Sequence, residues 1–225
     1  MNYYSSEILN KAQKKIVAHK NGPALVIAGA GSGKTRVITH RVAHLIQSGV
    51  PASSILLLTF TNKAADEMTQ RIGRTIDNSI DQHKIIHGTF HSVGNRFLRQ
   101  HAKLLDYKNN FSILDTSDSK EMIRAAIAEI MGKPGKLFPK ATVLQNLFSL
   151  AFNRNGSQDA ILKLPYHKRN FHLDQLIFSD YPHFEEYRET IIKILAIYRK
   201  KKKRAQVMDF DDLLENWLEL LVIHG

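Results

Sequence analysis

Three glycines alternate with other residues between Ala28 and Lys34, and a threonine follows the lysine. Because glycine lacks a Cβ atom, such a run can turn with positive φ and approach a ligand closely. A lysine and a hydroxyl at this spacing after a glycine loop are typical of a phosphate-binding loop. Backbone amides and the positive end of a following helix would hold phosphates, Lys34 would neutralise the β and γ phosphates, and Thr35 would offer its hydroxyl to Mg²⁺. The sequence therefore predicts a nucleoside triphosphate site, although Ala28 stands where the usual pattern begins with glycine.

Hydrophobic patterns predict the elements that would position this loop. Short apolar runs typical of buried parallel strands alternate with stretches of helical period. We expect strands at Ala24–Ala28, Ile55–Phe60 and Lys84–Phe90, and helices at 5–20, 33–47 and 62–72, the last capped by Asn62. This alternation indicates a parallel, doubly wound sheet, in which ligands lie at the carboxyl ends of the strands.

Aromatic and polar side chains follow the second and third expected strands. Phe60 lies between two threonines and precedes Asn62 closely, and Phe90 and His91 follow Thr89. An aromatic ring in such a place can stack on a base for about 1–3 kcal/mol, and hydroxyls and amides can hold phosphates. Core packing is the alternative for either phenylalanine, but their shared place on the ligand side of the sheet favours contact with nucleic acid.

The chain changes character after Ser92. Strand–helix alternation stops, and helical periods predict helices at 120–131, 141–153 and 183–204, with a loop-rich stretch at 154–182 between them. Asp115 is expected to open a capped turn before the first of these helices, and Asp209 to cap a last helix near the end of the chain.

These patterns divide the chain into an α/β domain and a mostly helical subdomain inserted into it. We interpret residues 1–92 as the first part of the domain, 93–205 as the insertion and 206–225 as the return segment.

Charge and composition narrow the class of partner. The 225 residues include no cysteine, which excludes disulfides and thiolate metal sites, and the net charge of +11 favours a polyanion such as nucleic acid. The basic run Arg199–Arg204 could contact a phosphate backbone or could be a solvated helix end. No apolar run approaches a membrane span and the N-terminal stretch lacks the apolar core of a signal peptide, so we expect neither membrane insertion nor export.

A nucleotide hydrolase also needs a carboxylate at the end of a buried strand to hold Mg²⁺ and position water. The acidic pair Asp211–Asp212 lies inside a helical pattern after a polar stretch, so we do not expect it to be that metal site. We expect the chain to end before the strand that would supply this carboxylate.

Together these pieces resemble the UvrD/Rep (PcrA-like) family of superfamily 1 DNA helicases. The motifs that match in order and spacing are LNKAQ, AGAGSGKTR, TFTNKAADEM, GTFHSVGNRFLR, FSILD and MDFDDLL. The resemblance spans nearly the whole chain and is weakest over 130–200. It implies a RecA-like P-loop NTPase domain with a parallel sheet, interrupted by the helical insertion. It further implies a cytoplasmic, nucleoid-associated enzyme that uses ATP to move 3′ to 5′ along single-stranded DNA.

The resemblance also implies roles for single residues. Gln13, which by itself would be read as a solvated helix residue, would contact the adenine, and Arg36 would help to hold the base or ribose. The residues implied in binding ATP and Mg²⁺ are Gln13, Ala28, Gly29, Ala30, Gly31, Ser32, Gly33, Lys34, Thr35 and Arg36, with Thr35 on the metal. Those implied in binding single-stranded DNA are Phe60, Thr61, Asn62, Thr89, His91 and Arg96.

One departure from the family pattern is large. Family members continue into a strand ending in Asp-Glu and a second RecA-like domain with arginine fingers, and neither follows here. We therefore expect an N-terminal fragment that turns over ATP negligibly alone, with the rest of the helicase chain as its partner and single-strand/duplex junctions as its substrate. Two alternatives stay open, a DNA-binding module with a vestigial phosphate loop and a phosphate-loop kinase of another family. The DNA pathway that the parent serves, whether repair, replication restart or plasmid copying, also stays open.

Overall fold

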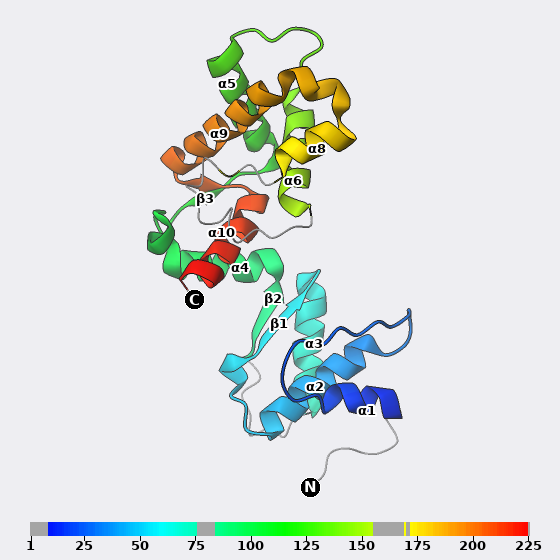
Figure 1. Ribbon diagram of the computed structural model, residues 1–225. Helices are drawn as coiled ribbons and strands as arrows, with labels where there is room; N and C mark the ends of the chain where they lie inside the picture. Colours follow the sequence, from blue (N-terminus) through cyan, green and yellow to red (C-terminus); the bar gives the residue numbers. More distant parts are fainter. Residues whose placement is uncertain (1–8, 76–83, 155–168, 170–171, 225) are drawn as a thin grey trace. The chain divides into compact units, whose positions relative to one another are not determined.

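The computed structural model describes residues 9–75, 84–154, 169 and 172–224. The chain divides into two compact units, residues 1–93 and 94–225 (Figure 1). No helix in the described part of the chain has the length and apolar character needed to cross a membrane.

The described part of the first unit is built on one pair of parallel strands and three α-helices, with a 3-10 turn at Ala52–Ser54. Its elements in chain order are α1 (Lys11–Val17), α2 (Lys34–Gln47), β1 (Leu56–Thr59), α3 (Asn62–Thr75) and β2 (Ile86–Thr89). The connection from β1 to β2 contains α3, as a parallel pair requires. The strands pair from Leu56 opposite Ile86 to Thr59 opposite Thr89, so their carboxyl ends lie side by side (Figure 1).

The core of this unit lies between the strand pair and the two longer helices. Its buried members come from α2, α3 and the strands or the residues next to them, namely Val42, Ala43, Ile46, Ile55, Leu57, Ile72 and Ile85. Alternate residues of β1 face this core: Leu57 is buried whereas Leu56 is exposed. This alternation fits a strand with one face covered by helices.

The expected buried strand at Ala24–Ala28 is not present. These residues have no regular secondary structure, and Leu25 and Ile27 are 89% and 91% exposed. A strand is defined by ladder hydrogen bonds to a neighbour, and among the described residues β1 pairs only with β2. The prediction of a buried strand here was wrong, because apolar composition alone does not supply the pairing partner that a strand needs.

The second unit is mostly helical, and α4 begins just before the boundary. Its elements are α4 (Phe90–His101), β3 (Ser112–Ile113), α5 (Thr116–Met131), α6 (Ala141–Asn153), α8 (Leu173–Asp180), α9 (Arg188–Ala205), β4 (Val207–Met208) and α10 (Phe210–Ile223), with 3-10 turns at Ala102–Leu105 and Pro182–Tyr187. β3 and β4 form a short parallel pair. The expected mixed α/β character with parallel pairing and a helical block is therefore confirmed.

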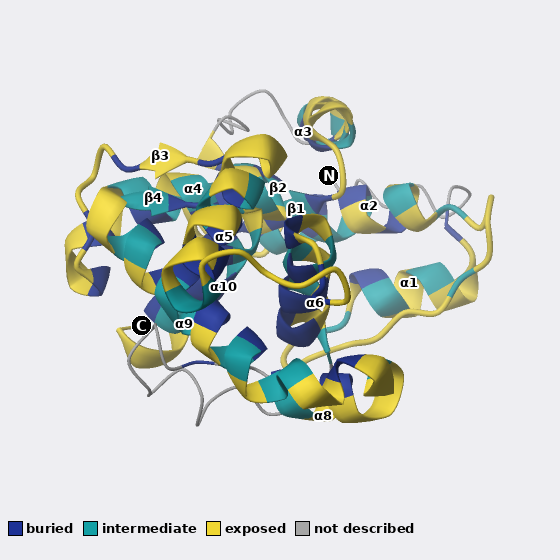
Figure 2. Cartoon of the chain, turned by 90° about the horizontal axis from the view of Figure 1, so that it is seen from above, coloured by how far each residue is buried: buried dark blue, intermediate teal, exposed yellow. Residues whose placement is uncertain are grey.

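Four helices of the second unit enclose its main core. α5, α6, α8 and α9 contribute fully buried side chains, including Ile123, Leu144, Ile177, Ile191 and Ile194. Figure 2 shows the buried and exposed residues alternating around these helices, as an amphipathic period requires.

Outside this core, α4 packs against α10. The ring of Trp217 lies against Gly94, where a Cβ atom would come within 3.1 Å of Trp217 Cε3. Phe97 stacks on the same indole at 6.1 Å between ring centres. The glycine thus permits close approach of the two helices.

The expected helix ends in the second unit are confirmed within one residue, but α5 begins at Thr116 instead of residue 120 and α9 at Arg188 instead of residue 183. α6 spans the predicted residues, and the Asp115 and Asp209 side chains cap α5 and α10 by accepting from the third amide of each helix. The expected helix 183–204 begins with a 3-10 turn before α9, and α8 lies in the stretch predicted to be loop-rich. Much of that stretch, 155–168, lies outside the described residues.

The segment 206–225 belongs to the second unit in the structure. β4 pairs with β3, and α10 packs beside α4. Its expected return to the first domain stays a prediction.

Candidate nucleotide site and nucleic-acid edge

The glycine loop turns through backbone angles that favour glycine. Gly31 has φ +73° and Gly33, which directly precedes α2, has φ +84°. Side chains with a Cβ atom rarely adopt these angles, so the two glycines are needed for this turn. The hydroxyl of Ser32 braces the loop by donating to the Gly29 carbonyl at 2.8 Å.

Lys34 folds back into the loop that precedes it. Its Nζ donates to the carbonyl oxygens of Ala28 at 3.1 Å and Gly29 at 2.6 Å. The loop therefore holds an ammonium group against its own backbone, which places a positive charge where a phosphate would need one.

The start of α2 suits an anion. No side chain caps this helix, and its first turn contains no acidic residue. The first amides of a helix lack intrahelical partners and carry the positive end of the helix dipole. Thr35 lies in this first turn, where its hydroxyl could join a Mg²⁺ ion bound to phosphates. The residues present thus fit a Mg²⁺–triphosphate group.

Gln13 reaches this loop from α1. Its Nε2 donates to the Ser32 carbonyl at 3.0 Å, while its Oε1 accepts from the Asn10 amide at 3.0 Å. A hollow of about 430 Å³ adjoins Gln13 and the glycine loop. Its lining includes Gln13, Ser32, Lys34, Val37, Ile38 and Arg41. This volume is in the range of small-molecule sites. The structure therefore brings together Gln13 and the glycine loop, 19 residues apart in sequence.

The charge around the start of α2 is positive. Burial, with a smaller contribution from the nearby Arg36 guanidinium, lowers the pKa of His40. Arg36 lies exposed one turn before it on α2.

The residues after β1 expose a single aromatic ring. Phe60 is 96% exposed and packs in no core. The neighbouring Thr61 caps α3, because its hydroxyl accepts from the Ala64 amide at 3.2 Å. The prediction that Asn62 caps this helix was wrong by one residue: Asn62 is the first helical residue and is exposed.

The residues after β2 form a reciprocal cap. The Thr89 amide donates to Ser92 Oγ at 2.8 Å, and the Ser92 amide donates to Thr89 Oγ1 at 3.1 Å. Phe90 and His91 follow in the first turn of α4, and Phe90 is 45% exposed. Ser92 was not singled out from the sequence, because the usual capping pattern has glutamate or glutamine at this position.

The strand register brings these two groups together. Thr59 and Thr89 are paired, so Phe60 and Phe90 follow neighbouring strand ends. The edge carries exposed rings, hydroxyls and an amide, the groups that can stack on bases and bind phosphates.

The basic residues of the second unit divide into exposed and structural ones. Arg96 is exposed on α4, whereas Arg99 donates to the carbonyls of Asn109 and Phe111 at 3.0 and 2.5 Å. In the run Arg199–Arg204, Arg199 and Lys202 are buried. This run is thus only partly a solvated surface.

The buried cations meet carboxylates of α10. Lys202 Nζ lies 2.6 Å from both Asp209 Oδ2 and Asp212 Oδ2. Burial and the nearby Asp209 carboxylate raise the pKa of Asp212 to about 7. Burial would also raise the pKa of Asp209, but the Lys202 ammonium outweighs it and holds this pKa at about 2. Asp211 accepts from Ser149 Oγ at 3.2 Å, so both members of the acidic pair have protein partners.

Two arginines complete this cluster. Arg169 and Arg199 lie 3.1 and 2.9 Å from the same oxygen of Glu215, and Arg169 lies 2.7 Å from Glu219. Sequence reasoning missed these pairs, since they join residues 16 to 50 positions apart.

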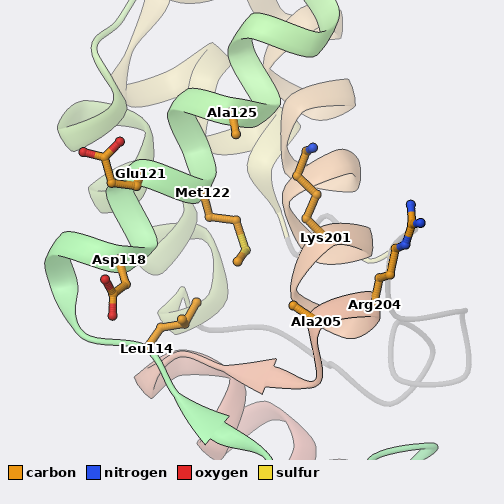
Figure 3. Close-up of a pocket in the computed structure, with 8 residues that line it drawn as sticks. All are labelled: Leu114, Asp118, Glu121, Met122, Ala125, Lys201, Arg204 and Ala205. Carbon is orange, nitrogen blue, oxygen red and sulfur yellow. The ribbon is translucent and has the colours of Figure 1, made fainter.

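A shallow hollow of about 760 Å³ lies between α5 and α9 (Figure 3). Asp118 and Glu121 of α5 and Lys201 and Arg204 of α9 give it walls of opposite charge. None of the site residues predicted from sequence lines it.

The fold and the site define a mixed α/β protein in which a glycine-rich turn opens a helix beside a parallel strand pair. The chain matches the family model of the UvrD/REP helicase N-terminal domain over residues 9–223, and it belongs to this family.

Named relatives cover nearly all of the chain. ATP-dependent DNA helicase PcrA of Bacillus subtilis is 35% identical over 224 residues, which are 98% of this chain and 27% of that protein. PcrA of Leuconostoc citreum is 33% identical over 94% of this chain and 26% of its own length. ATP-dependent DNA helicase UvrD1 of Mycobacterium leprae is 33% identical over 95% of this chain and 25% of its own length. The chain thus spans about a quarter of the length of these relatives.

Proposed function

We propose that this chain is the ATP-binding and DNA-contacting portion of an ATP-dependent DNA helicase that moves 3′ to 5′ on single-stranded DNA. Membership of the UvrD/REP family supports the class of enzyme. The observation that carries the nucleotide site is the Lys34 ammonium held 2.6 Å from the Gly29 carbonyl, at the start of a helix without a side-chain cap.

The nucleotide would bind as a Mg²⁺ complex at the start of α2. Lys34 would leave the loop carbonyls for the β and γ phosphates, and the amides of the first helical turn would hold the same oxygens. Thr35 would offer its hydroxyl to Mg²⁺, which neutralises charge that develops on the phosphates. Gln13 would contact the adenine and Arg36 the base or ribose. In this proposal the protein domain has the RecA-like P-loop fold.

Single-stranded DNA would bind along the carboxyl ends of β1 and β2. Phe60 would stack on a base, and Thr61, Asn62, Thr89 and His91 would contact the backbone or neighbouring bases. Arg96, which is exposed on α4, would contact a phosphate.

Turnover would need parts beyond this chain. The relatives are about four times as long, and the resemblance implies a second RecA-like domain with arginine fingers. Such fingers stabilise charge on the transferred phosphoryl group. Closing and opening the cleft between the two domains would step the enzyme along DNA, and the chain alone would hydrolyse ATP negligibly.

A pair of titrations tests this proposal. A fluorescent ATP analogue with Mg²⁺ is titrated with the 225-residue chain, and a labelled single strand is titrated at several salt concentrations. We expect saturable nucleotide binding and a log–log salt slope near −3 if about four phosphates are neutralised. DNA binding without nucleotide binding would favour the module with a vestigial loop. The absence of both would contradict the proposal.

A further inference from the structure

α1 needs tertiary contacts to hold its position. It has only seven residues, fewer than an isolated helix needs to be stable in water. One contact is apolar: Leu9 and Val17 bury against Val37 of α2. Polar contacts come from two side chains, Arg41 of α2 and Gln13 of α1 itself.

Arg41 binds the carboxyl end of α1. Its guanidinium donates to the carbonyl oxygens of Ile16 at 3.2 Å, Val17 at 3.2 Å and His19 at 2.6 Å. The last carbonyls of a helix lack intrahelical partners and carry the negative end of its dipole. Ile16 and Val17 end α1 and His19 follows its cap, so a charged donor shared by these three oxygens fixes this end of the helix to α2.

Gln13 fixes the amino end of α1 to the loop that precedes α2. Its amide donates to Ser32, two residues before α2 begins. Arg41 lies seven residues after Lys34, which is about 10 Å along α2. The two contacts thus hold α1 beside α2 at both ends, and one turn of α1 separates Gln13 from the carbonyls that Arg41 binds.

The contacts of Gln13 leave capacity for a ligand. A glutamine amide has two N–H donors and an oxygen with two lone pairs. One donor is used on Ser32 and one lone pair on the Asn10 amide. The remaining donor and acceptor are the pair that a glutamine uses to bind the N7 and N6 groups of adenine together. This recognition depends on the position of α1 relative to the loop.

We propose that Arg41 is a positioning residue for base recognition. It would act through Gln13, by holding α1 in the position in which the Gln13 side-chain amide faces the nucleotide. This inference rests on the proposed nucleotide site. It assigns preference for adenine to the α1–α2 contact, and retention of the triphosphate to the glycine loop and Lys34.

The test separates recognition of the base from binding of the phosphates. Fluorescent ATP and GTP analogues are titrated with wild type, Arg41→Ala, Gln13→Ala and the double variant, and inorganic tripolyphosphate is used as a competitor that has no base. We expect wild type to prefer ATP by about tenfold, the value of one good bidentate base contact. Arg41→Ala should remove most of this preference while tripolyphosphate affinity stays within about twofold, because the loop itself is unchanged.

Two further comparisons separate positioning from general damage. The double variant should show no less preference than Gln13→Ala, since residues acting through one contact are not additive. Arg41→Lys, which keeps the charge but not the planar fork of donors, should retain part of the preference. Arg71→Ala on α3, an exposed arginine, is the matched control and should leave the preference unchanged.

The titrations distinguish failure of the proposed function from failure of the inference about Arg41. If wild type binds neither ATP nor tripolyphosphate, the proposed function is wrong. The inference about Arg41 is overturned if wild type binds but shows no base preference, or if the preference survives in Arg41→Ala. It is also overturned if Arg41→Ala and Arg41→Lys weaken ATP, GTP and tripolyphosphate equally, or if the Gln13 and Arg41 effects add.

Discussion

The ammonium of Lys34 lies 2.6 Å from the carbonyl oxygen of Gly29, inside the loop that the lysine follows. A charge-assisted contact of this kind keeps the side chain in the loop instead of in water. A phosphate entering the loop would exchange a neutral carbonyl for an anionic partner, which is the stronger acceptor for an ammonium group. The structure thus shows a lysine already near the place where the proposed ligand would need it.

Replacing Lys34 with alanine should weaken nucleotide binding strongly. Hydrogen bonds to charged groups contribute about 1.5–3 kcal/mol, so we expect a loss of about 10- to 150-fold in affinity for an ATP analogue. Lys20→Ala, at an exposed lysine near the end of α1, is the control. In a longer protein that hydrolyses ATP, Lys34→Ala should abolish hydrolysis, and retained activity would show that the loop is misassigned.

Removing the exposed ring of Phe60 should weaken binding of single-stranded DNA without unfolding the protein. Loss of one stacked base costs about 1–3 kcal/mol, or about 5- to 150-fold in affinity. Because the ring is 96% exposed, the free energy of unfolding should change by less than about 0.5 kcal/mol. Phe178→Ala removes a ring that is 76% exposed on α8 and should leave DNA binding unchanged. Equal effects of the two variants would argue against a stacking site at Phe60.

Gly88 should not tolerate a side chain. It has φ +151°, and a Cβ atom there would lie 2.6 Å from Ser92 Oγ, which the Thr89 cap holds in place. We expect Gly88→Ala to lower the free energy of unfolding by about 1–3 kcal/mol in urea denaturation. Gly135→Ala is the control, since a Cβ atom at Gly135 would meet no atom within 4 Å. A neutral result at Gly88 would mean that the β2–α4 turn adapts easily.

Asp212 should make stability fall as pH rises. Its pKa is raised to about 7 in the folded protein, so between about pH 4 and 7 the folded state keeps a proton that the unfolded state has lost. The unfolding free energy should therefore decrease by about 1 kcal/mol per pH unit across this window. Asp212→Asn, which cannot titrate, should flatten the profile measured by urea denaturation.

The opposite sign holds for Asp209. Its pKa is lowered to about 2, so its stabilising contribution is complete above about pH 4 and is lost as pH falls toward 2. A wild-type profile that stays flat from pH 4 to 7 would contradict the assignment of the retained proton to Asp212.

Local signals in the sequence predicted local structure. Asp115 and Asp209 cap their helices because a cap depends on residues three positions away. The apolar runs at Ile55–Phe60 and Lys84–Phe90 contain β1 and β2, but the similar run at Ala24–Ala28 is not a strand, since its ladder partner is not encoded within the run. Thr61 replaced Asn62 as the cap because two adjacent residues carry nearly the same signal.

Contacts between distant residues were beyond sequence reasoning without the family resemblance. The glycine loop was found from its spacing, and the resemblance pointed to Gln13. Nothing in the sequence marked Arg41, whose partners lie 22 to 25 residues away. The buried Arg199 and Lys202 could not be told from exposed members of the same basic run, since burial is decided by the position of α10.

Because Arg199 and Lys202 point into the protein, they contribute little to the attraction of the helix end for DNA. Of the six consecutive basic residues at 199–204, only Lys200 and Arg204 are exposed, whereas Lys201 and Lys203 are half-buried. Counterions are displaced from DNA only by charges that reach its phosphates, so this helix end would release about two of them instead of six. The formal charge of +11 therefore overstates the electrostatic attraction that a nucleic acid would experience at this surface.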